Sequence, residues 1–178
     1  MRVITGSARG MTLRTLEGND VRPTTDKVKE ALFSAIQFEI EGRRILDLFA
    51  GSGQLGIEAL SRGAESAVFV DSDKNAVKIV KENLAKTKLD FKATVAQTDS
   101  IAFISMTDRI FDIAFLDPPY EKGLLQKALA KIGDNIAEGG MVICEHPFKE
   151  ELAEEYGDLK KSKEYKYSKV AVTVYRKS

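Results

Sequence analysis

Short apolar segments alternate with longer amphipathic segments between residues 44 and 145. The apolar segments are rich in Val, Ile, Leu and Phe, which is typical of strands buried on both faces. The segments between them place apolar residues at helical spacing. Because strands and helices alternate in this way, we expect an α/β fold with a mostly parallel sheet and helices on both faces.

The boundaries of the expected elements follow from the same pattern. Residues 2–5 and 11–15 should pair as an N-terminal β-hairpin, and the helix after it should be capped near Thr25. In the core we expect strands at 45–49, 67–70, 91–96, 111–116 and 140–145. Helices are expected at 54–62, along Val77, Val80 and Leu84, and at 98–105, 122–134 and 148–156. Two closing strands within 163–176 should add an antiparallel edge, giving seven strands in the sheet.

A chain of 178 residues is long enough for one domain with a sizeable core. We expect residues 1–178 to form that single domain. Within it, residues 1–20 are the hairpin appendage, residues 21–43 a helical lead-in, and residues 44–178 a Rossmann-like core.

Charge and composition narrow the function classes. The net charge is zero, but residues 1–29 and 159–178 are basic whereas residues 30–158 are acidic. Basic ends that meet on one face would favour phosphates. No apolar run is long enough for a membrane helix, so we expect a cytoplasmic protein without a membrane partner. The single cysteine, Cys144, and the single histidine, His146, are interpreted as structural residues, and no metal site is expected.

The segment Asp117-Pro118-Pro119-Tyr120 follows an apolar strand directly. Each proline lacks a backbone N–H, and Pro119 keeps Pro118 out of helical geometry, so the chain leaves the sheet extended with free carbonyl oxygens. A carboxylate, a free carbonyl and an aromatic ring together suit a flat group that carries an amine. We interpret this segment as a site that holds such an amine for attack on a methyl donor.

A second motif lies after the first core strand. Gly51 and Gly53 allow a sharp turn and a close approach of a ligand to the backbone. Asp47 precedes them and could bind the amino end of S-adenosylmethionine, while Asp71 ends the next strand, where a carboxylate can bind a ribose diol. Asp99 follows the third strand and could contact the adenine or cap a helix.

The same glycines satisfy the pattern of a dinucleotide-binding loop, so an NAD-dependent dehydrogenase is an alternative. The acidic residue at Asp47 and the proline pair of residues 117–120 argue against hydride transfer.

With both motifs in place, the chain resembles the bacterial small-subunit (16S) ribosomal RNA guanine-N2 methyltransferase family. The similarity runs nearly end to end, through the segments Val3–Gly6, Arg22–Phe33, Asp47–Leu60 and Asp117–Tyr120. The Arg-Pro-Thr-x-Asp segment is the most specific, because the Asp-Pro-Pro-Tyr motif also occurs in adenine-N6 methyltransferases. The sequence departs from the family at Ser168, where glycine is more usual before the last strand.

The resemblance implies a class I S-adenosylmethionine-dependent methyltransferase fold. It implies a monomer that methylates ribosomal RNA, either free or in a small ribosomal subunit particle. The residues expected to act in catalysis are Asp117, Pro118 and Tyr120. Those expected to bind the cofactor are Asp47, Phe49, Gly51, Gly53, Asp71, Asp99 and Ser100. Those expected to contact the RNA are Arg9, Arg14, Arg22 and Thr24.

Two alternatives remain at this point. The first is an adenine-N6 methyltransferase that acts on DNA or RNA. The second is a non-catalytic RNA-binding module that keeps the same fold. The loss of Asp117 or of the glycines would favour that module, and all of them are present.

Overall fold

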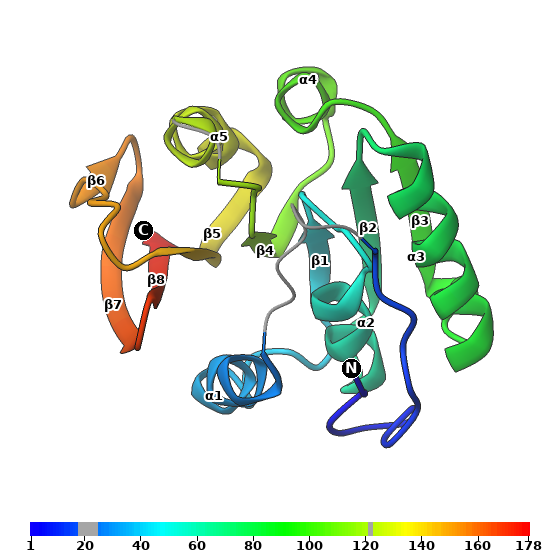
Figure 1. The fold of residues 1–178 in the computed structure, drawn as a ribbon. Helices are drawn as coiled ribbons and strands as arrows, with labels where there is room; N and C mark the ends of the chain where they lie inside the picture. The colour runs from blue at the N-terminus through cyan, green and yellow to red at the C-terminus, as the bar shows by residue number, and fades with distance from the viewer. Residues whose placement is uncertain (18–24, 121–122) are drawn as a thin grey trace.

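The computed structural model describes residues 1–17, 25–120 and 123–178. Within these residues, one sheet of eight strands has the order β3-β2-β1-β4-β5-β8-β7-β6 (Figure 1). The strands are β1 (Arg44–Asp47), β2 (Ser66–Asp71), β3 (Ala93–Gln97), β4 (Phe111–Leu116), β5 (Ile136–Pro147), β6 (Glu155–Tyr156), β7 (Leu159–Tyr167) and β8 (Val170–Lys177).

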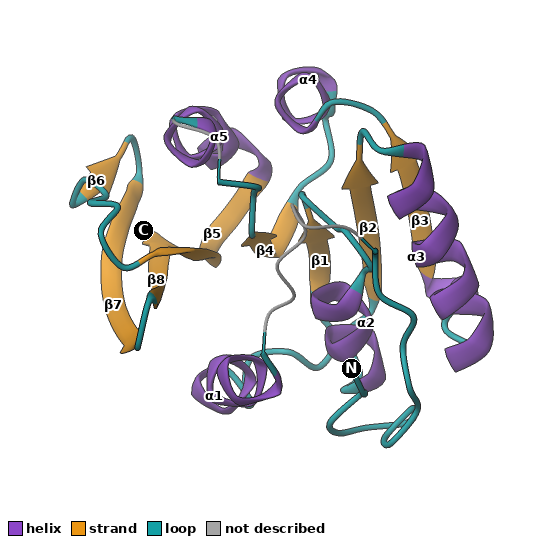
Figure 2. Ribbon diagram, in the orientation of Figure 1, coloured by secondary structure: helices purple, strands orange, loops and turns teal. Residues whose placement is uncertain are grey.

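The helices divide between the two faces of the sheet, as Figure 2 shows. They are α1 (Asp26–Ala35), α2 (Gln54–Ser61), α3 (Lys74–Thr87), α4 (Ser100–Met106) and α5 (Leu124–Ile132). Buried residues of α1, α2 and α3 share one hydrophobic cluster, and those of α4 and α5 share another. Short 3-10 turns occur at Asp90–Lys92 and Gly133–Asn135.

Strand pairing gives the sheet two distinct parts. Strands β1 to β5 pair in parallel, whereas β8 pairs antiparallel with β5, and β7 pairs antiparallel with β8. This arrangement confirms the expected Rossmann-like sheet with an antiparallel edge.

The central strands are buried on both faces because their side chains alternate between the two helical layers. In β4, Ile113 and Phe115 pack in the cluster beneath α1–α3, and Ala114 and Leu116 pack in the cluster beneath α4 and α5. Asp47 follows the same alternation and faces α2, where its carboxylate meets Gly56.

The prediction of a helix at 148–156 is wrong. Within this segment Glu155–Tyr156 forms the short strand β6, which is why the sheet has eight described strands rather than seven. Two contacts with the antiparallel edge hold the segment extended. The Tyr175 hydroxyl donates to the Ala153 carbonyl at 2.6 Å, and the Lys161 amide donates to the Glu154 carbonyl at 2.8 Å.

Several other elements are shorter than expected, among them β1, which ends at Asp47 and not at residue 49. Residues 90–92 form a 3-10 turn, so β3 begins only at Ala93. The helix expected at 122–134 runs from Leu124 to Ile132 and continues as a 3-10 turn. The beginning of that expected range lies outside the described residues.

Residues 1–17, called the N-terminal arm below, pair more loosely than a regular hairpin. A single antiparallel bridge joins Arg2 and Thr12 within the described residues. Gly6 makes the turn with a φ of 96°, and a Cβ atom there would lie 1.9 Å from the Ser61 carbonyl oxygen. The arm therefore needs glycine at this position in order to lie against α2.

Glu58 of α2 fixes the arm from within the core. Its carboxylate is fully buried and accepts hydrogen bonds from the Ile4 and Thr5 amides at 2.8 and 3.1 Å. It also pairs with Lys29 at 3.2 Å and with Arg62 at 2.9 Å. Burial lowers the pKa of the Lys29 ammonium, although Glu58 opposes that shift. Two cations and two amides thus satisfy one buried carboxylate.

Candidate active site

Four aspartates lie at or just beyond the carboxyl ends of the parallel strands. They are Asp47, Asp71, Asp99 and Asp117, from β1, β2, β3 and β4 respectively. The strand order reverses between β1 and β4, and ligands of open α/β sheets bind in the crevice at such a reversal. Because Asp47 pairs with Phe115, the segment that begins at Asp117 leaves the sheet beside the glycine loop.

Asp47 is buried, with 2 % of its surface exposed. Its Oδ2 atom accepts one hydrogen bond from the described chain, donated by the Gly56 amide at 3.0 Å. Burial raises the pKa of its carboxyl to about 7, against the smaller opposing effect of that hydrogen bond. Glycine is required at position 56, because a Cβ atom would lie 2.4 Å from the Phe69 ring. The Asp47 carboxylate therefore lies beside the start of α2 with lone pairs that can still accept hydrogen bonds.

The glycine loop is tied to the end of β2. Gly51 has a φ of 57°, and its amide donates to Asp71 Oδ2 at 2.9 Å. The other oxygen of Asp71 accepts from the Asp73 amide at 2.9 Å, and burial raises the pKa of the Asp71 carboxyl. Gly53, with a φ of 81°, stands at the N-cap of α2. Each Asp71 oxygen keeps a lone pair with which it could accept from a hydroxyl group.

The start of α4 closes this region from the other face of the sheet. Asp99 caps the helix by accepting from the Ala102 amide at 2.9 Å. The buried hydroxyl of Ser100 donates to the Leu48 carbonyl at 2.6 Å, which joins α4 to the end of β1. Phe49 is half-buried against the hydrophobic cluster that contains the buried residues of α4 and α5. These contacts give Asp99 and Ser100 structural roles, and their expected contacts with a cofactor remain predictions.

Sequence reasoning missed two polar residues beside the loop. Gln54 begins α2 and is buried, yet its Oε1 atom has no hydrogen-bond partner in the described part of the chain. Asn83 of α3 donates to the carbonyls of Ser52 and Arg14, both at 2.9 Å, and accepts from the Arg14 amide at 2.8 Å. A glutamine at the first turn of a helix within a glycine motif was the available signal for Gln54. Asn83 gave no signal.

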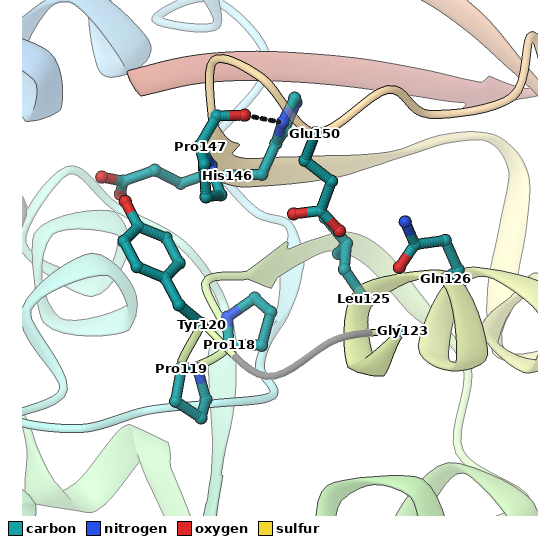
Figure 3. A pocket seen from close by; sticks show the side chains of 10 residues that line it. Pro118, Pro119, Tyr120, Gly123, Leu125, Gln126, His146, Pro147 and Glu150 are labelled. Atoms are coloured by element: carbon teal, nitrogen blue, oxygen red, sulfur yellow. Dashed lines mark hydrogen bonds between the residues drawn. The ribbon is translucent and has the colours of Figure 1, made fainter. Parts of the chain in front are cut away.

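The Asp117–Tyr120 segment borders a pocket of about 380 Å³ (Figure 3). Asp117 is half-buried and Pro118 is buried, whereas Tyr120 is 55 % exposed. The opposite wall comes from the end of β5 and the turn after it, and from α5. Its residues are Gly123, Leu125, Gln126, Glu145, His146, Pro147 and Glu150. The expected catalytic segment thus faces a space large enough for a small ligand.

His146 and Cys144 have structural surroundings. His146 Nδ1 lies 3.0 Å from the Pro147 carbonyl oxygen, so this nitrogen is the one that carries the hydrogen. Nε2 then accepts from the Thr173 hydroxyl at 2.8 Å. The Cys144 side chain is fully buried, and burial raises the pKa of its thiol well above the usual range. Neither side chain is arranged as a nucleophile.

The residues expected to contact RNA are only partly described. Arg9 is exposed on the N-terminal arm, and Arg14 pairs with Glu82 of α3 at 2.6 Å. Arg22 and Thr24 lie outside the described residues.

Two properties of the described ranges bear on other functions. No helix in them is both long and apolar enough to cross a membrane. Their His, Cys, Asp and Glu side chains form no group of three or more that could hold a metal ion.

The chain is similar to known proteins over most of its length. The model of a family described as conserved hypothetical protein 95 matches residues 1–176. YlbH of Bacillus subtilis, described as a candidate rRNA methyltransferase, is 42 % identical, with 99 % of each chain covered. Ribosomal RNA small subunit methyltransferase D of Escherichia coli is 37 % identical, over 76 % of this chain and 68 % of its own.

A solved structure extends the comparison to the whole fold. The yhhF protein of Escherichia coli, described as a candidate methyltransferase, superposes with a TM-score of 0.91. It is 30 % identical, and the match covers 100 % of this chain and 98 % of that one.

Proposed function

The chain belongs to the family described as conserved hypothetical protein 95, and from this premise we propose that it methylates the N2 amine of a guanine in small-subunit ribosomal RNA. The proposed methyl donor is S-adenosylmethionine. Relatives named as rRNA or small-subunit rRNA methyltransferases support the class of reaction and of substrate. The choice of the guanine N2 amine rests on the Asp-Pro-Pro-Tyr segment and on the resemblance described above.

One observation carries the proposal. Asp117 follows β4 at the reversal of strand order, beside the glycine loop, and Pro118 and Tyr120 after it line the pocket. This arrangement supports the proposal, because an amine held by the segment would lie between a space for a base and the proposed site for the donor. A dehydrogenase has no use for a proline-flanked carboxylate at this position.

The residues around the glycine loop fit S-adenosylmethionine. The buried Asp47 carboxylate and the unpartnered Gln54 Oε1 are acceptors that suit the ammonium group of its amino-acid part. Gly51 and Gly53 leave room for a ligand against the backbone, and Asp71 can accept from ribose hydroxyls. When bound, S-adenosylmethionine supplies a methyl group on a positively charged sulfur.

The protein's task in this reaction is placement. The lone pair of the guanine N2 nitrogen is delocalised into the ring, so the amine is a weak nucleophile. The Asp117 carboxylate and the Pro118 carbonyl would each accept one N–H of the amine, which localises the lone pair and aims it at the methyl group. The same two oxygens would stabilise the positive charge that grows on nitrogen. Tyr120 would stack on the base, which must be turned out of any helix.

Methyl transfer from labelled S-adenosylmethionine tests the proposal. The acceptors are small ribosomal subunits and ribosomal RNA from cells that lack the protein, and the product nucleosides are separated afterwards. We expect label in N2-methylguanosine. Label in N6-methyladenosine would establish the adenine enzyme instead. Cofactor binding without any label would favour a binding module.

An alanine variant of Asp117 tests the catalytic assignment in the same assay. Asp117→Ala should lower turnover by about 10²–10³-fold while S-adenosylmethionine affinity stays within a few-fold of wild type. The matched control is Asp108→Ala, which removes an exposed aspartate from the loop before β4. Wild-type turnover by Asp117→Ala would contradict the assignment.

A further inference from the structure

Asn83 of α3 holds two segments that are far apart in the sequence. It is buried, with 1 % of its surface exposed. Its Nδ2 atom donates to the Ser52 and Arg14 carbonyls, both at 2.9 Å, and its Oδ1 atom accepts from the Arg14 amide at 2.8 Å. Because a carbonyl only accepts and an amide N–H only donates, these partners leave one orientation for the Asn83 side chain. Both of its N–H groups are used, one on the N-terminal arm and one on the glycine loop.

Ser52 is the residue of the glycine loop that α3 holds. It lies between Gly51 and Gly53, which have φ angles of 57° and 81°. Glycine adopts such angles at no steric cost, so these two neighbours do not by themselves fix the direction of the Ser52 carbonyl. The Gly51 amide is fixed by Asp71 at 2.9 Å. The hydrogen bond from Asn83 adds a second fixed point, which ties the loop to α3.

The N-terminal arm continues from Arg14 onto the same loop. A Cβ atom added to Gly51 would lie 3.9 Å from the Leu16 side chain, so Leu16 packs beside that glycine. Arg14 also pairs with Glu82 of α3 at 2.6 Å. In Figure 1 the arm runs past α2 toward α3. The arm is thus fixed to α3 at Arg14, and two residues later it lies against the glycine loop.

We propose that Asn83 is a positioning residue for S-adenosylmethionine binding, and that it holds the glycine loop in place by joining it to the N-terminal arm. This inference rests on the proposed function, because it takes the glycine loop as the cofactor site. Asn83 acts through the Ser52 carbonyl without touching the cofactor, and the arm acts through Asn83. A binding site that loses its supporting contacts loses affinity even when every residue that contacts the ligand is still present.

Calorimetric titration with S-adenosylmethionine, in the absence of RNA, tests the role of Asn83. Asn83→Ala removes all three hydrogen bonds, and the dissociation constant should rise about tenfold. In the methyl-transfer assay the KM for S-adenosylmethionine should rise by a similar factor, whereas kcat at saturating donor should stay within about twofold of wild type. The matched control is Glu82→Ala, which removes the exposed ion pair with Arg14 and leaves the bonds of Asn83 in place. Such pairs contribute little, so its dissociation constant should match wild type.

A substitution in the first turn of the arm tests the role of the arm. Gly6→Ala places a Cβ atom 1.9 Å from the Ser61 carbonyl oxygen, which should displace the arm from α2. Although this clash is with α2 and not with the glycine loop, the dissociation constant should rise about three- to tenfold. The matched control is Gly10→Ala, because Gly10 has a φ of 82° in the same arm but a Cβ atom there would meet nothing within 4 Å. Both changes place alanine at a positive φ, and only Gly6→Ala adds a clash.

Two further variants complete the test. Gly6→Ala combined with Asn83→Ala should bind within about twofold of Asn83→Ala alone, because both changes remove the same support. Leu16→Ala is a milder change that keeps the turn at Gly6, and it guards against a failure of Gly6→Ala to fold. It should raise the dissociation constant about threefold, because less apolar surface packs against the loop.

The outcomes separate the inference from its premise. Each titration is run well below the melting temperature of the variant, so that a change in stability alone does not alter the dissociation constant. Wild-type affinity in Asn83→Ala, or an equal loss in Glu82→Ala, would overturn the role of Asn83 and leave the proposed function standing. Wild-type affinity in folded arm variants would overturn the role of the arm. A wild-type protein that binds no S-adenosylmethionine would overturn the proposed function and the inference with it.

Discussion

Asp47 and Glu58 are both buried carboxylates beside α2, and their surroundings differ in one respect. Glu58 is contacted by the Lys29 and Arg62 cations and by two amides of the N-terminal arm. Asp47 receives one hydrogen bond from the described chain, from the Gly56 amide. A buried carboxylate is costly unless it is paired. Glu58 is paired within the protein, whereas Asp47 keeps lone pairs that could accept from a bound ligand.

This difference separates a carboxylate with a structural role from one for which we propose a role in binding. Both residues occur in the same stretch, 47–60, that carries the family resemblance, so sequence similarity alone does not distinguish them. Their hydrogen bonds do. Substitutions at the two carboxylates should therefore differ in what they change.

Removing the charge of Glu58 should destabilise the fold strongly. Glu58→Gln keeps the size of the side chain but turns an amide N–H toward donors, and it leaves Lys29 without its buried partner. We expect a loss of about 3–5 kcal/mol in the free energy of unfolding, measured with denaturant. Glu65→Gln, at an exposed position, is the control. A loss below about 1 kcal/mol would show that Glu58 is not a structural centre.

The corresponding change at Asp47 should act on the ligand instead. Asp47→Asn removes a charge that the protein does not pair, so the free energy of unfolding at pH 8 should stay level or rise by about 1–2 kcal/mol. The affinity for S-adenosylmethionine should fall by about 10²-fold, because a partly buried ion pair with the ammonium is lost. Calorimetric titration measures the affinity. A variant that binds as tightly as wild type would remove Asp47 from the site.

The pH dependence should follow the pKa of about 7 at Asp47. Only the ionised carboxylate attracts the ammonium, so S-adenosylmethionine affinity should weaken by about tenfold from pH 8 to pH 6. Because this pKa lies above the unfolded value of about 3.9, the folded protein binds the extra proton between those limits. The contribution of Asp47 to stability therefore falls as pH rises from about 4 to about 7. The difference between wild type and Asp47→Asn isolates both effects from Asp71, and a pH-independent difference would contradict the assignment.

The smallest effect should come from the β7–β8 turn, remote in sequence from both carboxylates. Ser168 has a φ of 58°, a conformation that glycine adopts more easily. Ser168→Gly should raise the free energy of unfolding by about 0.5–1 kcal/mol and leave S-adenosylmethionine affinity unchanged. Thermal unfolding measures the change. Lys169→Gly, at the next residue of the same turn, has no positive φ to relieve and should give no gain.

The parallel part of the fold was predictable because its signals are local. Ile113 and Phe115 alternate with Ala114 and Leu116, and each set packs against one helical layer. The helix predicted at 148–156 was wrong, although the local pattern of residues suits a helix. Tyr175, which is 22 positions after its partner Ala153, and Lys161 of the neighbouring strand hold it extended. Tertiary contacts of this kind override propensity.

The candidate site likewise contains residues that the sequence predicts and residues whose contacts it does not predict. The aspartates at strand ends could be expected, since the carboxyl ends of parallel strands meet at one edge of the sheet. The bonds of Asn83 to Ser52 and Arg14 join three segments that no periodicity connects. The burial of Lys29 also had no signal, because lysine is almost always exposed.

The hydrogen bonds that hold the N-terminal arm have a consequence for folding during synthesis. Arg14 bonds to Asn83, a residue 69 positions later, and Ile4 bonds to Glu58, 54 positions later. At about 5–20 residues per second, synthesis produces the arm several seconds before its partners exist. The first segment to be made can therefore be placed only after residues 58–83 have been made. Since Asn83 also bonds to Ser52, one side chain of α3 joins that earliest segment to the glycine loop.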